Sequence, residues 1–364
     1  MRLAPRLAAC ILPLAIALLA GCNSITYSIH PVPTAEAQYR AYGDSITRGA
    51  GLSDPESQAY PGQVSAFESV TFTNNSVDGD MACDLATSQI FPNQDNPTLA
   101  NRPTYTVMIG TNDIGTKPNL PSYQQVFIAC HLGALTWLGI PAENKVLATS
   151  PKVVTHGPGA IDASNHWDSW TTAGPGASVS FPITLSSAGP IYAWPRIDDN
   201  SSATYTYSLD GVELGSRAVQ TNPRMLTKDG GTNSMILIRI PGVPAGKHVV
   251  TFTQTNEGSE GVSVVGIAAP VGLTREQMPL LLVGIIPFEE NNGHGGRCTS
   301  VDEVCNEYIQ DIEDDEALLL GDGLNLRIFN SRNYMFATPS EMVDASHPNL
   351  LGHAEIAKSV EAVW

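Results

Sequence analysis

The chain has 364 residues and a formal net charge of −17, because 36 Asp and Glu residues outnumber 19 Lys and Arg residues. This length is sufficient for two domains of ordinary size. Binding to a phosphate backbone requires clustered positive charge, and no basic cluster occurs in the sequence, so nucleic acid is excluded as an expected partner.

The first 22 residues have the layout of a secretory signal. Two arginines precede an apolar run over residues 7–20, which is short for a transmembrane span. The segment ends in Leu19-Ala20-Gly21-Cys22, which resembles a bacterial lipoprotein cleavage box. The resemblance implies that residues 1–21 are a signal peptide and that lipidation of Cys22 tethers the protein to the cell envelope. Asn23 after the cysteine would suit the outer membrane if the cell is Gram-negative. The alternative is a plain secreted protein.

Residues 36–141 alternate predicted strands with polar motifs. We expect strands over 39–42, 70–77 and 104–109, and a helix over 122–138 whose apolar residues recur at helical spacing. Each strand leads into a motif that contains polar residues: Gly43-Asp44-Ser45, Asn75-Ser76-Val77-Asp78-Gly79-Asp80 and Gly110-Thr111-Asn112-Asp113. Ser45 and Asn112 would therefore lie at the carboxyl ends of strands, where open α/β sheets hold their sites.

Residues 142–275 differ in composition, because Ser, Thr, Gly, Val and Tyr replace most charged residues. Short alternating segments recur, and Asp210-Gly211 is a turn signal. This pattern predicts an inserted antiparallel β-sandwich. If residues 145–154 form its first strand, the insert leaves the sheet at the edge opposite the site and could serve only to support or tether the catalytic domain. If they form a strand of the parallel sheet instead, the insert shapes the substrate groove. We favour the first alternative.

Several side chains of the insert have two interpretations. Three tryptophans could stack on sugar rings, although we expect them to be core residues: Trp167, Trp170 and Trp194. Three aspartates could bind calcium, although turn formation is the simpler explanation: Asp198, Asp199 and Asp210. We therefore expect no metal site.

Residues 276–364 resume the alternation of strands and helices. The continuous apolar run 279–287 fits a central parallel strand. A helix over 301–320, a strand over 326–329 and a closing helix over 353–363 follow. Together with the first part they predict a doubly wound, five-stranded parallel sheet in a three-layer α/β/α arrangement. Asp344 and His347 precede the last helix.

A Gly-Asp-Ser triplet alone would occur by chance in roughly one chain in ten. The ordered set of Ser45, Gly79, Asn112, Asp344 and His347, however, resembles the SGNH (GDSL-type) hydrolase superfamily, which has a flavodoxin-like fold. The pattern departs from the family at Val77-Asp78, where members often have an extra glycine.

The resemblance implies a role for each member of this set. Ser45 would be the nucleophile, His347 the base that takes its proton, and Asp344 the partner that orients the imidazole. The oxyanion would be held by the N–H groups of Ser45 and Gly79 and by the side-chain amide of Asn112. Asp44 would brace the loop, and no cofactor is expected.

Four cysteines remain once Cys10 is removed with the signal and Cys22 is assigned to lipid: Cys83, Cys130, Cys298 and Cys305. An even number in an exported protein suggests two disulfides. Three pairings are possible. We favour Cys83–Cys130, which would brace the oxyanion loop that the resemblance implies, and Cys298–Cys305, which would close a short loop.

The predicted function is hydrolysis of carboxylic esters, acetyl or short-chain acyl, on carbohydrate. One alternative is a lysophospholipase or lipase, which the lipid anchor favours. A second is an O-acyltransferase, since the same acyl-enzyme serves both reactions. A third is a carbohydrate-binding surface protein without activity, against which the complete set of site residues argues. The expected partner is thus a small-molecule or polysaccharide ester, with the membrane contacted only through Cys22.

Overall fold

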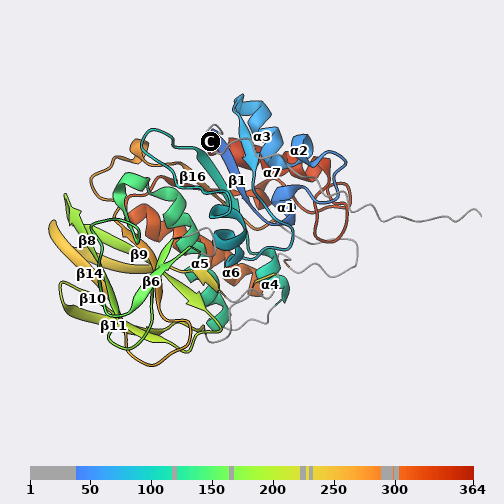
Figure 1. Cartoon of the computed structure of the whole chain (residues 1–364). Coiled ribbons are helices and arrows are strands. Elements are labelled where there is room, and N and C mark those ends of the chain that lie inside the picture. The colour runs from blue at the N-terminus through green and yellow to red at the C-terminus, as the bar shows by residue number, and fades with distance from the viewer. Residues whose placement is uncertain are drawn as a thin grey trace, which may run out of the picture. The chain divides into compact units, whose positions relative to one another are not determined.

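The computed structural model describes residues 38–116, 121–163, 168–221, 227–228, 233–287, 298 and 303–364 (Figure 1). The signal peptide, Cys22 and Trp167 lie outside the described residues. No helix within these ranges combines the length and the apolar character needed to cross a bilayer.

The first sheet has five parallel strands in the order β17-β16-β3-β1-β2. Their bounds are β1 (Tyr39–Gly43), β2 (Phe72–Asn74), β3 (Thr104–Met108), β16 (Leu281–Ile285) and β17 (Leu326–Asn330). Counted along the chain, this is the order 2-1-3-4-5 of a doubly wound sheet. The prediction of a five-stranded parallel sheet is confirmed.

The second strand is shorter than the predicted run over residues 70–77. The side chain of Asn74 accepts a hydrogen bond from the N–H of Ser76 at 3.2 Å and donates to the carbonyl of Thr47 at 2.9 Å. This turn removes the chain from the sheet at the end of β2, so the motif at Asn75–Asp80 is a loop.

Alternate residues along the strands of the parallel sheet belong to two different hydrophobic cores. Ala41 and Leu282 belong to a core shared with α3 (Tyr60–Glu68) and α7 (Leu350–Glu361). Tyr42 and Val283, the next residues along the same strands, belong to a core shared with α5 (Pro121–Gly139) and α6 (Glu303–Gly321). Since successive side chains of a strand point to opposite faces, each core lies on its own face of the sheet.

The remaining helices of this part are short. They are α1 (Ser45–Arg48), α2 (Pro55–Gln58), α4 (Thr111–Thr116), a π-helix η1 (Leu85–Ile90), and 3-10 turns η2 (Ala142–Asn144), η3 (Arg275–Gln277) and η4 (Ser331–Asn333). Two of them, α1 and α4, begin directly after β1 and β3, and they place the predicted serine and asparagine at the carboxyl edge of the sheet.

Two antiparallel sheets form the inserted part (Figure 1). One has the order β11-β10-β14-β8-β5 and consists of β5 (Val154–His156), β8 (Ser178–Leu185), β10 (Thr204–Leu209), β11 (Val212–Ala218) and β14 (Gly246–Gln254). The other has the order β12-β9-β15-β7-β6 and consists of β6 (Gly159–Asp162), β7 (Ser169–Thr172), β9 (Gly189–Asp198), β12 (Asn233–Met235) and β15 (Ser263–Ala268). In the second sheet β4 (Lys145–Leu147) also pairs with β15, and β13 (Ile238–Val243) also pairs with β9.

The segment after α5 enters the sandwich and not the parallel sheet. Strand β4 pairs antiparallel with β15, with Lys145 opposite Ala268. This is the entry that we favoured from the apolar run at 279–287, which becomes the fourth parallel strand. The insert therefore begins and ends on neighbouring strands.

One face of the second sheet packs against the helix α5. Along β9, Ile191 and Ala193 belong to the core between the two antiparallel sheets, whereas Tyr192 and Trp194 belong to the core that contains α5. Trp194 is fully buried, and its Nε1 donates to Oγ1 of Thr136 at 3.0 Å. The core interpretation of Trp194 is confirmed.

Candidate active site

Ser45 follows β1 as the first residue of α1. The carboxylate of Asp44 accepts a hydrogen bond from the N–H of Ile46 at 2.9 Å and caps the helix, which is the bracing role expected of it. A Cβ at Gly43 would lie 2.2 Å from Oγ1 of Thr47 and 2.4 Å from the carbonyl oxygen of Met108, so only glycine fits there. This close packing fixes the loop that carries the serine.

His347 lies between Ser45 and Asp344. Its Nε2 is 3.0 Å from Oγ of Ser45, and its Nδ1 is 2.9 Å from Oδ2 of Asp344. A proton on Nδ1 would be shared with the carboxylate, which leaves Nε2 as an acceptor for the serine proton. The structure thus brings Ser45 together with Asp344 and His347, which lie about 300 positions later in the sequence.

The loop that carries Asp344 is fixed by its own carboxylate. Oδ1 of Asp344 accepts hydrogen bonds from the N–H groups of Ser346 and His347, both at 2.8 Å. Partial burial alone would raise the pKa of Asp344, but the hydrogen bonds from the His347 ring and from these two amides together outweigh it and lower the pKa. The carboxylate is therefore ionised whenever the imidazole is in use.

The predicted oxyanion residues Gly79 and Asn112 are connected through the loop that contains Gly79 and Asp80. Gly79 has φ of 79°, in the left-handed region that favours glycine. The side-chain amide of Asn112, on α4, donates to the carbonyl of Asp80 at 2.9 Å. The same loop is tied to the serine loop, because the N–H of Val77 donates to the carbonyl of Gly43 at 3.1 Å.

Gln89 on η1 connects these loops and was not foreseen from the sequence. Its Oε1 accepts from the N–H of Gly43 at 3.0 Å, while its Nε2 donates to the carbonyl of Gly43 and to Oδ2 of Asp80, both at 2.8 Å. Gln89 and Asp80 are buried. A lone glutamine in a stretch of mixed polarity carries no signal of this role.

Lys228 is the second residue that the sequence did not reveal. It belongs to the insert, between β11 and β12, yet its aliphatic chain lies against Gly79: a Cβ there would be 3.3 Å from Cδ of Lys228. The insert thus begins with a strand of the sandwich, as we favoured, and it also contacts the predicted oxyanion loop through Lys228.

Both expected disulfides are present. Cys83 and Cys130 join the chain after the predicted oxyanion loop to α5, with 4.9 Å between their Cα atoms. Cys298 and Cys305 close the short loop at the start of α6. The favoured pairing is confirmed.

Two titratable groups beside the site have strongly shifted pKa values. Burial raises the pKa of Asp113, next to Asn112, to about 8, although the N–H of Ala82 donates to its carboxyl. Burial lowers the pKa of His353 to about 3, and its Nδ1 accepts from the N–H of Tyr60 at 3.2 Å. His353 is therefore neutral at working pH.

The aspartates that were candidates for calcium ligands accept hydrogen bonds within the insert. Oδ1 of Asp198 accepts from the N–H of Asn200, Oδ1 of Asp199 accepts from Thr221, and the carboxylate of Asp210 accepts from the N–H of Val249. Within the described ranges, no group of three or more His, Cys, Asp or Glu residues is arranged to hold a metal ion.

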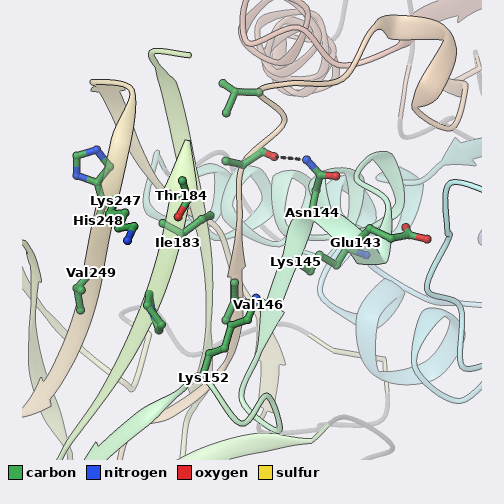
Figure 2. A pocket seen from close by; sticks show the side chains of 13 residues that line it. Glu143, Asn144, Lys145, Val146, Lys152, Ile183, Thr184, Lys247, His248 and Val249 are labelled. Carbon is green, nitrogen blue, oxygen red and sulfur yellow. Dashed lines mark hydrogen bonds between the residues drawn. The ribbon is translucent and has the colours of Figure 1, made fainter. Parts of the chain in front are cut away.

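A groove of about 690 Å³ lies on the insert, between the start of β4 and strands β8 and β14 (Figure 2). Its lining includes the exposed lysines Lys152 and Lys247 and the apolar side chains of Ile183 and Val249. Neither Ser45 nor any other residue of the predicted catalytic set lines it. The groove is therefore not the place where Ser45 and His347 would react.

No family model matches the chain, and no curated protein matches it. Similar solved structures include a two-domain esterase active on acetylated mannans, at 13% identity over 65% of this chain and 91% of that chain, with a TM-score of 0.36. They also include family 35 carbohydrate-binding modules. One, from an environmental isolate, has 16% identity over 34% of this chain and 89% of that chain, with a TM-score of 0.28. Another, from Clostridium thermocellum, has 16% identity over 34% of this chain and 96% of that chain, with a TM-score of 0.27. TM-scores this low transfer neither activity nor ligand to this chain.

Proposed function

We propose that the protein is a serine esterase of the SGNH type with a three-layer α/β/α hydrolase domain. The observation that carries the proposal is the contact of 3.0 Å between Nε2 of His347 and Oγ of Ser45, with Asp344 on the other ring nitrogen. A hydroxyl needs such a base to become a nucleophile at neutral pH. Ser45 and Asn112 each lie in the first turn of a short helix that follows a parallel strand, and these positions support the same assignment.

In the proposed mechanism, Ser45 attacks the ester carbonyl while His347 takes its proton. The tetrahedral oxyanion accepts hydrogen bonds from the N–H groups of Ser45 and Gly79 and from the amide of Asn112. His347 then protonates the leaving alcohol, and the acyl group remains on Ser45. Water, deprotonated by His347, releases the acid and restores the serine.

The proposed substrate is an acetyl or short-chain acyl ester on a polysaccharide. Support comes from the antiparallel sandwich beside the hydrolase domain, whose Lys228 lies against the oxyanion loop. Export through a lipidated Cys22 remains a prediction. It keeps a lysophospholipid as the second candidate, because a lipid anchor would hold the site at a membrane surface.

The test is turnover of p-nitrophenyl esters from acetate to palmitate, beside acetylated xylan and lysophosphatidylcholine. We expect acetate to be preferred among the aryl esters and acetylated xylan among the natural ones. Ser45→Ala and His347→Ala should each reduce turnover by several orders of magnitude, and the double variant should be little worse, because the two side chains act as one unit. Wild-type turnover by folded Ser45→Ala protein would refute the proposal.

A further inference from the structure

Lys228 contacts the predicted oxyanion loop and the residues after it through its backbone N–H, its aliphatic chain and its ammonium. Its backbone N–H donates to Oδ2 of Asp84 at 2.9 Å, and the same oxygen accepts from the N–H of Met81 at 3.0 Å. Its aliphatic chain lies over Gly79, since a Cβ there would be 3.3 Å from Cδ and 3.4 Å from Cε. Its ammonium is 4.0 Å from Oδ1 of Asp80. Lys228 of the insert thus contacts three nearby residues: Gly79, Asp80 and Asp84.

Asp80, which faces this ammonium, is the residue on which the site converges. Its side chain is only 2% exposed. Its Oδ2 accepts from Gln89, which also holds both backbone groups of Gly43, and its carbonyl accepts from the amide of Asn112. A displacement of Asp80 would therefore reach the serine loop and the two other oxyanion donors together.

A buried carboxylate needs compensation of its charge, because removal from water disfavours the ionised form. The ammonium of Lys228 brings a positive charge to within 4.0 Å of Oδ1, and Ser88 and Gln89 donate hydrogen bonds to Oδ2. Lys228 itself keeps a side-chain exposure of 33%. Its ammonium therefore keeps contact with water while its apolar part covers the loop, the usual arrangement of a partly buried lysine.

The insert also contacts the parallel-sheet part at positions further along the chain. Close by, Oγ of Ser234 donates to the carbonyl of Cys83 at 2.7 Å, and Cys83 is bonded to Cys130 on α5. The N–H of Leu237 donates to the carbonyl of Ala129, also on α5, at 3.1 Å. The contact of Lys228 with Gly79 is thus one of several that join the insert to the parallel-sheet part.

We propose that Lys228 is a positioning residue of the esterase, through which the inserted sandwich holds the oxyanion loop in its donating geometry. The inference rests on the proposed function. It assigns to the insert a share in the chemical step, separate from any binding of polysaccharide. Lys228 acts through Gly79 and Asp80, so its effect should be on the transition state and not on the binding of a small ester.

Three variants of Lys228 test the proposal on p-nitrophenyl acetate. Lys228→Ala removes both the chain over Gly79 and the charge, Lys228→Met keeps the chain, and Lys228→Arg keeps both. We expect kcat to fall by about tenfold or more in the alanine variant and by about threefold to tenfold in the methionine variant, since small displacements of catalytic groups have effects of this order or larger. The arginine variant should retain at least about half of kcat.

KM should stay within about twofold in all three variants, and the inhibition constant of a boronic acid should rise in parallel with the loss of kcat. A boronic acid forms a tetrahedral adduct on serine and reports the oxyanion site, whereas KM reports ground-state binding when acylation is the slow step, which single-turnover kinetics establish. Lys247→Met, at an exposed lysine of the groove in Figure 2, is the matched control and should behave like wild type.

Wild-type kcat in Lys228→Met would overturn the proposal, because the ammonium would then have no part. A rise in KM at unchanged kcat would also overturn it, since Lys228 would then contact the substrate. If Lys228→Ala fails to fold, the methionine and arginine variants decide the question. Failure of the proposed function is distinct: it would appear as full activity of Ser45→Ala, whatever the lysine variants do.

Discussion

The contribution of Asp344 to turnover can be estimated from its distance to His347 and its exposure. At 2.9 Å, attraction between the carboxylate and an imidazolium amounts to about 1.4 kcal/mol at the dielectric constant of water and about 6 kcal/mol at an effective value of 20. The side chain of Asp344 is 56% exposed, so solvent screens the pair and the lower part of this range applies. We take about 3 kcal/mol, which corresponds to about a hundredfold in rate.

Asp344→Asn should therefore lower kcat/KM on p-nitrophenyl acetate by about a hundredfold. This is well below the roughly 10⁴-fold effect of the same change at the buried aspartate of chymotrypsin-like proteases. The asparagine oxygen can still accept from the N–H groups of Ser346 and His347, so the loop should keep its shape. A loss below threefold would mean that Asp344 does not support the imidazole. A loss near 10⁴-fold would refute the argument from exposure.

The insert contains a matched control for this experiment. Oδ2 of Asp210 lies 2.8 Å from Nδ1 of His248, and the side chain of Asp210 is 47% exposed, which is close to the value for Asp344. His248 lies on β14 and Asp210 lies in the turn between β10 and β11, and both are outside the predicted catalytic set. Asp210→Asn should therefore leave kcat/KM at the wild-type value.

Three further predictions concern the surroundings of the triad. Asn112→Ala should lower kcat on p-nitrophenyl acetate by about 10²-fold with KM nearly unchanged, because its donor acts mainly in the transition state; an effect on KM alone would make it a binding residue. The folded-state pKa of His353 is lowered to about 3, against about 6.5 in the unfolded chain, so stability is present above pH 6.5 and is lost as pH falls towards 3. Urea unfolding should give about 2 kcal/mol less at pH 5 than at pH 7 from this group, and His353→Asn should remove that difference; an unchanged difference would exclude His353 as its source. Replacing Cys83 and Cys130 together by alanine should lower the free energy of unfolding by about 2–4 kcal/mol, since their separation of 47 residues closes a long loop; a change below 1 kcal/mol in urea unfolding would contradict this.

The sequence predicted those parts of the molecule that depend on local patterns. The apolar run at 279–287 became β16 (Leu281–Ile285), and the helical spacing at 122–138 became α5 (Pro121–Gly139). Ser45 and His347 could be predicted as partners because an ordered set of motifs carried the resemblance, and the structure places Nε2 of His347 3.0 Å from Oγ of Ser45. Residues 233–243 form two separate strands, β12 and β13, and between them the N–H of Leu237 donates to the carbonyl of Ala129 on α5, a break that the local pattern does not indicate.

Contacts between distant segments were beyond prediction. Lys228 and Gln89 act through surroundings that only the folded chain assembles, and neither has a neighbour in sequence that indicates its role. Asp80 illustrates the same limit: its motif predicted a loop, but its burial and its contact with an ammonium from the insert depend on how two separately patterned segments pack. Local pattern carries no information of that kind.

The neighbouring ends of the insert have a consequence for the order of folding. Strands β3 and β16 pair directly, although the whole sandwich is translated between them. If the insert were unstructured, joining these strands would close a loop of about 170 residues, from Met108 to Leu281. Once β4 and β15 have paired, only roughly 50 residues of this connection remain outside the sandwich, which lowers the entropic cost of closure by about 1 kcal/mol. A chain that forms its sandwich first therefore pairs β3 with β16 as a late step and at a lower entropic cost.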